Sequence, residues 1–231
     1  MKKTIVITGG SSGIGESICN HLSQDDDYEV INLSRNKNIN KKIFNIKCDV
    51  SNYTNVKNAF KKIKKIDILI NNAGITKYSS NIILNFEKII KTNLISAFYC
   101  GNEAYKKFNI KGDSRIINIG SINAYLGFPK NQGYVASKGA LVSLTRAMAV
   151  DFVKKKTNVN SISPGYIKTK MTIDSFQNSN EKKKRLDRMI IKRWGKPEDL
   201  FGVVELLISK KSQYITGQDF VVDGGWTVKG L

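Results

Sequence analysis

The chain has little of the residue types on which metal sites and disulfide frameworks depend. Its 231 residues include one histidine, His21, and three cysteines, Cys19, Cys48 and Cys100. The cysteines are odd in number and have no metal-ligand spacing, so they predict free thiols in a reducing compartment. His21 lies on an expected helix, where we expect a packing or surface role. No metal site is therefore predicted.

Long apolar runs are also missing. No segment approaches the roughly 18 consecutive apolar residues of a membrane span, so no membrane partner is expected. The apolar stretch after Met1-Lys2-Lys3 is too short for the core of a signal peptide and is typical of a first strand. These two observations predict a cytoplasmic protein.

Acidic residues are scarce relative to basic ones. The chain has 19 Asp and Glu against 38 Lys and Arg, a formal net charge of +19. Such a charge can indicate a nucleic-acid-binding protein. Here the lysines are spread along the chain beside asparagine and isoleucine, and no ladder of aromatic residues accompanies them. We therefore expect no nucleic-acid partner, but a positive field that attracts anionic substrates and cofactors.

Strand and helix patterns alternate along the chain, with no repeat and no linker to divide it, and the length suits one domain. Strand patterns fall at 3–8, 29–34, 43–48, 67–71, 115–120, 158–163 and 219–222, and helical patterns at 14–23, 53–64, 86–108, 134–154 and 197–209. This alternation predicts an α/β fold with a parallel sheet of about seven strands, helices on both faces and ligands at the carboxyl ends of the strands.

The connection between the second and third expected strands is unusually short. Only seven residues separate Arg35 from Ile43, whereas a parallel crossover with its helix needs a dozen or more. We therefore expect most of this helix to be missing.

A glycine-rich turn, Thr8-Gly9-Gly10-Ser11-Ser12-Gly13-Ile14-Gly15, joins the first strand to the first helix. Glycines lack a Cβ, which permits the tight turn and lets a pyrophosphate approach the backbone. The helix N-terminus adds unpaired N–H groups and a partial positive charge. The turn predicts a dinucleotide site formed by Gly9, Ser11, Ser12, Gly13, Ile14 and Gly15.

The end of the second strand bears on the choice of cofactor. Ser34 and Arg35 stand where a cofactor without a 2′-phosphate normally meets an acidic residue. An arginine can instead form charge-assisted hydrogen bonds with a phosphate. We therefore predict that Ser34 and Arg35 bind NADP, with NAD as the alternative.

Tyr134 and Lys138 predict proton-transfer chemistry. They lie four residues apart on an expected helix and so face the same direction. A tyrosine hydroxyl has a reference pKa near 10, and a cation about 4 Å away can lower that pKa by roughly 2–3 units. We expect Lys138 and the positive nicotinamide ring to supply this charge, so that Tyr134 gives a proton to a carbonyl oxygen. Ser121, which follows the fifth expected strand, can hydrogen-bond the same oxygen.

Together with Asn71-Asn72-Ala73-Gly74, these motifs resemble those of the short-chain dehydrogenase/reductase family, in the family's order from Ile5 to Gly225. The resemblance implies one doubly wound Rossmann domain over 1–231 that transfers a hydride between NADP(H) and a carbonyl or alcohol. It also implies a homodimer or homotetramer, formed through helices 86–108 and 134–154 and the C-terminal segment.

The resemblance also assigns roles to individual residues. It implies that Asn93 holds a water that relays protons through Lys138, and that Tyr134 and Lys138 also contact the cofactor. The remaining implied cofactor contacts are Asp49 and Val50 at the adenine, Asn72, Ala73 and Gly74 at the adenosine ribose, and Pro164, Gly165, Ile167 and Thr169 at the nicotinamide.

The polar segment 170–193 is predicted to be a lid over the substrate. Its basic cluster, Lys182 to Arg185 with Arg188, would favour an anionic substrate. Helical spacing places Arg185 and Arg188 on one face.

Two substrate classes stay open, as does one alternative without catalysis. The segments 193–198 and 223–226 resemble those of enzymes for sugar acids and polysaccharide pathways, which favours a sugar, sugar acid or polyol. The segments 72–76 and 214–217 resemble those of 3-oxoacyl-(acyl-carrier-protein) reductases. A nucleotide-sensing protein on the same fold would lack Ser121, Tyr134 or Lys138, and this chain has all three.

Overall fold

The protein is described by a computed structural model that covers residues 2–77, 80–110 and 112–229. Its sheet has the strand order β3-β2-β1-β4-β5-β6-β7, with every neighbouring pair parallel. The predicted α/β fold with seven parallel strands is therefore confirmed. The strands are β1 (Lys3–Thr8), β2 (Tyr28–Ser34), β3 (Phe44–Lys47), β4 (Ile68–Asn71), β5 (Ser114–Ile119), β6 (Thr157–Pro164) and β7 (Asp219–Val222).

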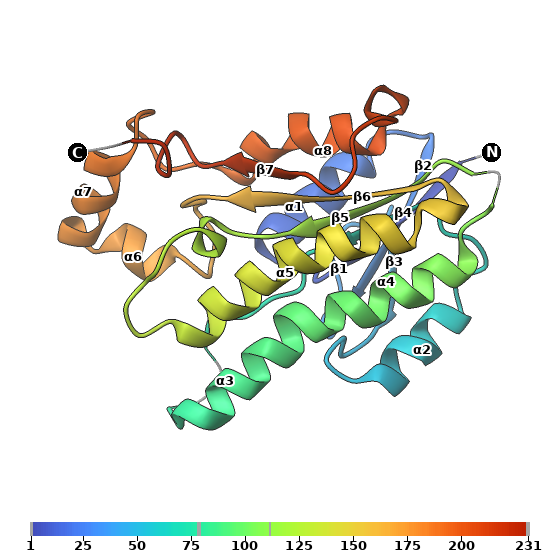
Figure 1. Cartoon of the computed structure of the whole chain (residues 1–231), viewed down its shortest axis with the longest axis horizontal. Helices are drawn as coiled ribbons and strands as arrows, with labels where there is room; N and C mark the ends of the chain where they lie inside the picture. Colours follow the sequence, from blue (N-terminus) through green and yellow to red (C-terminus); the bar gives the residue numbers. More distant parts are fainter. Residues whose placement is uncertain (1, 78–79, 111, 230–231) are drawn as a thin grey trace.

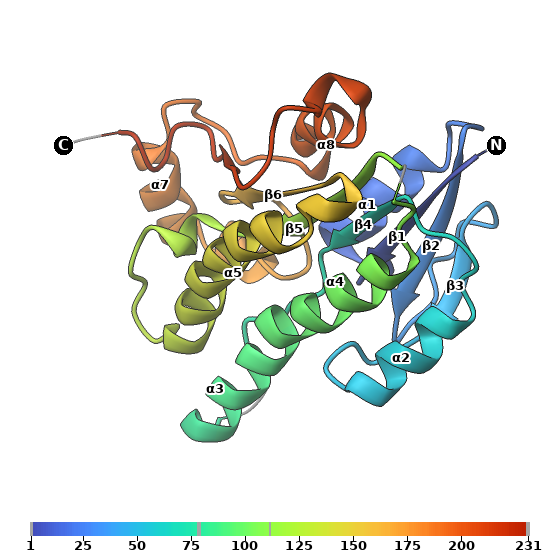
Figure 2. The ribbon, with the colours of Figure 1, turned by 45° about the vertical axis from the view of Figure 1, so that its right-hand side comes forward.

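Helices cover both faces of the sheet (Figure 1 and Figure 2). On one face, α1 (Gly13–Leu22) and α8 (Phe201–Ile208) pack against Ile5, Ile7 and their neighbours in the sheet. On the other face lie α2 (Tyr53–Lys61), α4 (Ser96–Lys107) and α5 (Gln132–Asp151), which pack against Val6. The side chains of successive strand residues point to opposite faces, so one strand contributes to the apolar packing on both faces of the sheet.

Asparagine side chains cap the N-termini of three helices. Asn52 caps α2 by accepting a hydrogen bond from the N–H of Asn55 at 3.0 Å. Asn81 caps α3 (Ile82–Ile90) and Asn178 caps α7 (Ser179–Arg188) in the same way. Each side chain pairs a backbone N–H that the first helical turn leaves without a partner. The abundant asparagines thus fix where these helices begin.

The helix predicted over 86–108 is in fact three consecutive elements. α3 is followed by a π-helical turn, Lys91–Ile95, and then by α4. A π turn closes its hydrogen bonds over one more residue than an α turn and is frequent at functional sites. Here it contains the buried side chain of Asn93. The apolar period of the sequence continues across the turn, which is why the sequence did not reveal it.

The remaining boundaries differ from the predicted ones by a few residues, and the missing crossover helix is confirmed. Residues 35–43 contain no helix and connect β2 to β3 directly. The end predicted for the helix at 134–154 is a separate 3-10 turn, Val153–Lys155, and the start predicted at 197 is another, Pro197–Leu200.

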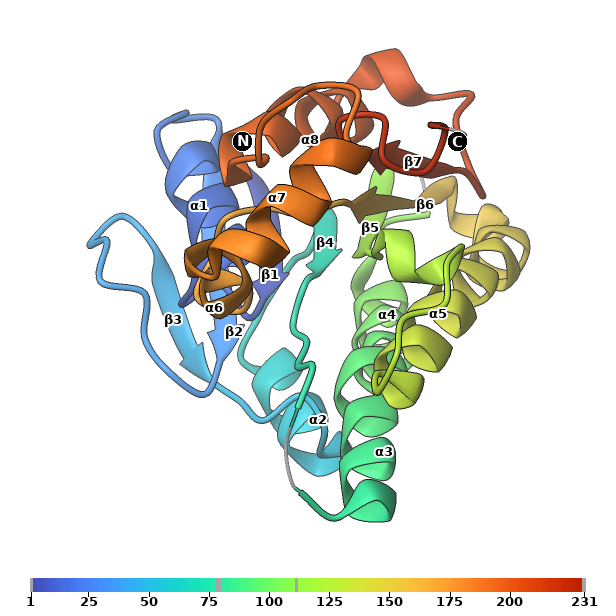
Figure 3. The same ribbon diagram turned by 90° about the vertical axis from the view of Figure 1, so that its left-hand side faces the viewer.

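The predicted lid contains two short helices, α6 (Ile173–Gln177) and α7. Figure 3 shows both beyond the carboxyl ends of the strands, across from α3. Among the described residues, no helix is long and apolar enough to cross a bilayer, and no group of acidic, histidine and cysteine side chains could hold a metal ion.

Candidate active site

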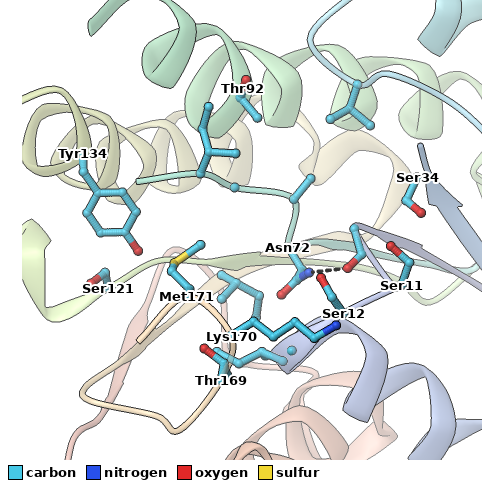
Figure 4. A pocket seen from close by; sticks show the side chains of 18 of the residues that line it. Ser11, Ser12, Ser34, Asn72, Thr92, Ser121, Tyr134, Thr169, Lys170 and Met171 are labelled. Carbon is cyan, nitrogen blue, oxygen red and sulfur yellow. Dashed lines mark hydrogen bonds between the residues drawn. The ribbon is translucent and has the colours of Figure 1, made fainter. Parts of the chain in front are cut away.

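A cleft of about 430 Å³ lies at the carboxyl ends of the strands, where the strand order reverses between β1 and β4. Open parallel sheets bind their ligands at this position. Figure 4 shows Tyr134 and Ser121 at one end of the cleft and Ser11 and Ser34 at the other. The predicted residues that line it are Gly9, Ser11, Ser12, Gly13, Ile14, Ser34, Arg35, Asp49, Val50, Asn72, Ala73, Gly74, Ser121, Tyr134, Lys138, Pro164, Gly165, Ile167 and Thr169.

Two predicted residues, Gly15 and Asn93, lie beside the cleft rather than on its lining. A Cβ on Gly15 would clash with the side-chain amide of Asn72. Asn72 Nδ2 donates to the Thr8 carbonyl at 3.0 Å, and the N–H groups of Asn72 and Ala73 donate to Thr8 Oγ1 at 3.0 Å. Gly15 therefore permits the close packing that locks the glycine turn to the loop after β4.

The cleft fits an extended dinucleotide. Gly9 and Gly13 have φ values of 68° and 58°, which residues with a Cβ rarely adopt. The first turn of α1 follows and directs its unpaired N–H groups toward the cleft, where a pyrophosphate is favoured. A nicotinamide at the far end would lie beside Pro164, Ile167 and Thr169. These residues could thus hold NAD(P) along the whole cleft.

At the reaction end, the side chains of Ser121, Tyr134 and Lys138 converge. Burial raises the pKa of Tyr134, and a hydrogen bond with Ser121 offsets part of that rise. Lys138 Nζ donates to the Ile119 carbonyl at 2.7 Å and lies 5.6 Å from the centroid of the Tyr134 ring. Burial lowers the pKa of Lys138 to about 8.

The predicted lowering of the Tyr134 pKa by Lys138 and the nicotinamide ring stays a prediction. Lys138 is 3% exposed and directs its ammonium group to a backbone carbonyl. Desolvation disfavours the charged form of both groups, so it raises the pKa of Tyr134 and lowers that of Lys138. The sequence showed that the two residues share a helix face, but not how completely they are desolvated.

Asn93 sits under the loop that follows β4. Its side chain donates to the Ile75 carbonyl at 2.9 Å and accepts from the Ile75 N–H at 2.8 Å. It also donates to Ser137 Oγ, on the same helix as Tyr134, at 3.2 Å. Asn93 thus ties the loop over the cleft to the helix of Tyr134 and Lys138. Its predicted role in holding a relay water stays a prediction.

Asp49 lines the cleft, and its implied contact with the adenine stays a prediction. Its carboxylate accepts from the Ser51 N–H at 3.0 Å and from Ser51 Oγ at 2.7 Å. Burial raises the pKa of Asp49, but these hydrogen bonds and the charges of Lys88 and Arg35 outweigh it, and the net pKa is lowered. Asp49 is therefore an anion held by neighbouring groups.

The sequence reasoning missed several residues that line the cleft. They include three lysines, one asparagine amide and two threonine hydroxyls. Two of the lysines stand close behind recognised motifs, and this position could have signalled them: Lys77 is three residues after the Asn-Asn-Ala-Gly run, and Lys170 directly follows Thr169. The missed residues are Asn36, Lys77, Lys88, Thr92, Lys170, Met171 and Thr172, with the apolar or small Leu33, Cys48, Ile75, Ile119 and Gly120.

Arg185 and Arg188 of the lid rest on aromatic rings and do not line the cleft. The guanidinium of Arg185 lies 4.8 Å from the centroid of the Tyr166 ring and pairs with Glu181. The guanidinium of Arg188 lies 5.2 Å from the centroid of the Trp226 ring. Their predicted contact with an anionic substrate stays a prediction, whereas the observed contacts hold α7 against the domain.

Replacing Arg188 with alanine should therefore expose Trp226. The chain has two tryptophans, and Trp226 is 6% exposed while Arg188 covers its ring. A cation over an aromatic ring contributes about 0.5–2 kcal/mol, and Arg188→Ala removes this contact. Water should then reach the Trp226 ring and shift tryptophan emission to longer wavelength. Lys183→Ala, on the exposed side of α7, is the control. An unchanged spectrum for Arg188→Ala would show that α7 stays docked without this contact.

The fold and the cleft together define an oxidoreductase that binds a nicotinamide dinucleotide. Comparison with known proteins agrees. The family model described as Enoyl-(Acyl carrier protein) reductase matches residues 10–227. The chain belongs to the short-chain dehydrogenase/reductase family and is an NAD(P)-dependent enzyme that acts on a CH–OH/C=O pair.

The relatives differ in substrate. The chain is 37% identical to the 3-oxoacyl-(acyl-carrier-protein) reductase FabG of Rickettsia bellii, over 96% of each chain. It is 31% identical to the 2-dehydro-3-deoxy-D-gluconate 5-dehydrogenase of Dickeya dadantii, over 98% of this chain and 96% of that one. Its structure is similar to that of 4-hydroxyisoleucine dehydrogenase complexed with NADH, with a TM-score of 0.93 and 34% identity over 99% of this chain and 100% of that one.

Proposed function

We propose that the protein uses NADP(H) to interconvert a carbonyl compound and the corresponding alcohol. The observation that supports NADP is the end of β2. Ser34, Arg35 and Asn36 line the cleft there, and none of them is acidic. Asp49, the nearby carboxylate, is already bonded to Ser51. A cationic side chain beside the adenosine ribose favours a 2′-phosphate, whereas a carboxylate would repel it.

The proposed chemistry places acid–base work on Tyr134. When bound, the nicotinamide supplies or accepts the hydride. The Tyr134 hydroxyl gives its proton to the substrate oxygen in the reducing direction and takes it back in the oxidising direction. Ser121 Oγ, which also bonds to Asn123 Oδ1 at 3.1 Å, orients that oxygen. A tyrosine hydroxyl has a reference pKa near 10 and is protonated at neutral pH, so Tyr134 holds the proton that it gives.

We propose a sugar acid, sugar or polyol as the substrate. Ile122, Met189 and Trp226 are buried against one another and against Tyr166, beside Ser121. These apolar side chains pack on one another and do not line the cleft, which favours a small polar substrate over a long chain. Lys77 also lines the cleft and offers a cation to a carboxylate. The likeness to a sugar-acid dehydrogenase supports the same substrate class.

A 3-oxoacyl group on acyl carrier protein is the second candidate. It is supported by the 37% identity to a reductase of that name. The net charge of +19 also suits an acidic carrier protein. In this case the acyl chain would have to enter through the open side of the cleft, past Met171, which is 50% exposed.

An assay of NADPH oxidation separates the two candidates. The panel contains keto sugar acids, neutral keto sugars, and 3-oxoacyl thioesters on pantetheine and on acyl carrier protein. We expect kcat/KM for a keto sugar acid to exceed that for every thioester. Higher values for the thioester on acyl carrier protein would reject the sugar-acid proposal. Turnover of no substrate in either class would reject both.

We also propose that the protein is a homo-oligomer in the cytoplasm. Large apolar side chains are exposed on the outer surfaces of α4 and α5, with Phe98 at 49% and Val150 at 74%. Association of these helices with a second copy would cover such side chains. Light scattering coupled to size-exclusion chromatography tests the proposal, and a monomer at micromolar concentration would reject it.

A further inference from the structure

Three asparagines lie beneath the glycine turn, in the place of the missing crossover helix. We call Asn32, Asn38 and Asn45 the asparagine cluster. Asn32 comes from β2, Asn45 from β3, and Asn38 from the loop between them. Asn32 is 1% exposed and Asn38 is 3% exposed. Burying polar amides is costly unless they are hydrogen-bonded, so the contacts of this cluster should matter for the fold or for the site.

The cluster holds the loop by side-chain hydrogen bonds. Asn45 Oδ1 accepts from the Asn38 N–H at 2.8 Å and from Asn32 Nδ2 at 2.8 Å. Asn45 Nδ2 donates to the Asn38 carbonyl at 3.1 Å. The backbone of Asn38 is thus bound on both sides by one amide. A helix would have satisfied these backbone groups internally, and here Asn45 does so instead.

One bond reaches from the cluster to the glycine turn. Asn38 Nδ2 donates to the Gly10 carbonyl at 2.8 Å, with both atoms buried. In a trans peptide, the C=O and the following N–H point in opposite directions. Because the Gly10 carbonyl points into the cluster, the N–H of Ser11 points the other way. Ser11 lines the cleft, so Asn38 sets the direction of an N–H donor at the cofactor site.

Gly10 itself is confined by the same cluster. A Cβ on Gly10 would clash with Cys19 Sγ and would lie 2.9 Å from Asn32 Oδ1. The turn therefore packs directly on the cluster with no space between them. A displacement of side chains in the asparagine cluster should therefore move the Gly10–Ser11 peptide, because no gap separates the two.

The cluster also contacts the loop that follows β2. The Asn36 carbonyl accepts from Asn32 Nδ2 at 3.3 Å and from Ser34 Oγ. Asn36 and its neighbour Arg35 both line the cleft. The cluster thus contacts two segments that line the cleft, the glycine turn and the loop of Arg35 and Asn36.

We propose that Asn38 is a positioning residue for recognition of the adenosine 2′-phosphate. It holds the Ser11 N–H and the loop of Arg35 at a fixed separation, so that both can bind one phosphate. This inference rests on the proposed use of NADP. It assigns selectivity to a residue that does not itself line the cleft, and to a loop that replaces a helix.

The test compares binding of two cofactor fragments by isothermal titration calorimetry. The fragment 2′,5′-ADP carries the 2′-phosphate, and 5′-AMP lacks it. The variants are Asn38→Asp, which keeps the size and the oxygen that accepts from the Asn40 N–H but removes the donor to Gly10, and Asn38→Ala. The control is Asn40→Ala, whose side chain bonds to Asn20 and Ser23 on the far side of the loop.

We expect both Asn38 variants to weaken 2′,5′-ADP about ten-fold or more, the scale of one hydrogen bond to a charged group, and to weaken 5′-AMP much less. The ratio of the two dissociation constants should therefore fall. With saturating NADPH, kcat should stay within about two-fold, while KM for NADPH rises, because the reacting atoms are untouched. Asn40→Ala should leave the ratio unchanged.

The outcomes distinguish a failure of the role inferred for Asn38 from a failure of the proposed use of NADP. A wild-type protein that binds both fragments equally would reject NADP use, and the inference with it. Selective wild-type binding that the Asn38 variants preserve, or that Asn40→Ala reduces equally, would reject the inference alone. If the variants do not fold, the chemical shift of the Ser11 amide of the wild-type protein is measured instead, by nitrogen–proton correlation NMR. Its signal should shift more with 2′,5′-ADP than with 5′-AMP, and equal shifts would overturn the role of Asn38.

Discussion

Tyr134→Phe should lower kcat by about 10²–10⁴-fold, the usual contribution of a general acid. The substitution removes the hydroxyl that would protonate the substrate oxygen and keeps the ring, which packs beside Lys138 with a distance of 5.6 Å from Nζ to the ring centroid. NADPH affinity should stay within a few-fold, because the cleft retains its shape. Single-turnover measurement of NADPH oxidation, together with fluorescence titration of NADPH, checks both parts.

Tyr125→Phe is the matched control. Tyr125 lies on the loop after Ser121, is 48% exposed, and donates its hydroxyl to Asp219 Oδ2 at 2.6 Å. Its removal should change the rate of the chemical step by less than about ten-fold, since loss of one surface hydrogen bond costs only about 0.5–1.5 kcal/mol. If Tyr134→Phe keeps more than a tenth of the wild-type rate, or if the two variants lose activity equally, Tyr134 is not the acid.

Arg35→Asp should reverse the cofactor preference from NADPH to NADH. Arg35 is exposed at the end of β2 and lines the cleft. A carboxylate there repels a 2′-phosphate and accepts hydrogen bonds from the two ribose hydroxyls. Loss of a charge-assisted bond of about 1.5–3 kcal/mol corresponds to a change of roughly ten- to a hundred-fold in kcat/KM for NADPH. Steady-state kinetics with each cofactor measures it.

Lys37→Asp provides the control for Arg35. Lys37 is exposed two residues further along the same loop and does not line the cleft. Lys37→Asp changes the net charge by the same amount as Arg35→Asp, so any general electrostatic effect on the anionic cofactor appears in both variants. A wild-type protein that already prefers NADH would contradict the NADP proposal, as would equal losses in the two variants. The helix-free 36–42 segment would then be the reason, because it sets the direction of Arg35.

Local patterns were sufficient for the fold and for most of the cleft. The alternation of apolar strands with helices determined the parallel sheet, because a βαβ chain can bury its apolar surfaces in few other ways. The glycine turn, the Asn-Asn-Ala-Gly run and the Pro164-Gly165 loop each follow a strand. Strands that run parallel bring their carboxyl ends to one edge of the sheet, so these motifs had to gather there.

Two features of the site depended on atoms that are far apart in the sequence. The pKa of Lys138 is lowered to about 8 by burial, and burial results from the packing of many segments. The π turn at Lys91–Ile95 directs Asn93 to Ile75, although the sequence continues the ordinary helical period. Neither desolvation nor a change in helical hydrogen bonding is encoded by the spacing of residues in one segment.

The sequence by itself determined the family, the parallel sheet, the loss of the crossover helix and the motifs that converge on the cleft, because each depends on local spacing and on the geometry of parallel strands. Only the tertiary structure decided what replaced the helix and where the lid cations lie. Asn38 reaches Gly10 across 28 positions, and Arg188 covers Trp226. Such contacts form only when the sheet and its loops have folded, since a side chain's partner is set by distance in space.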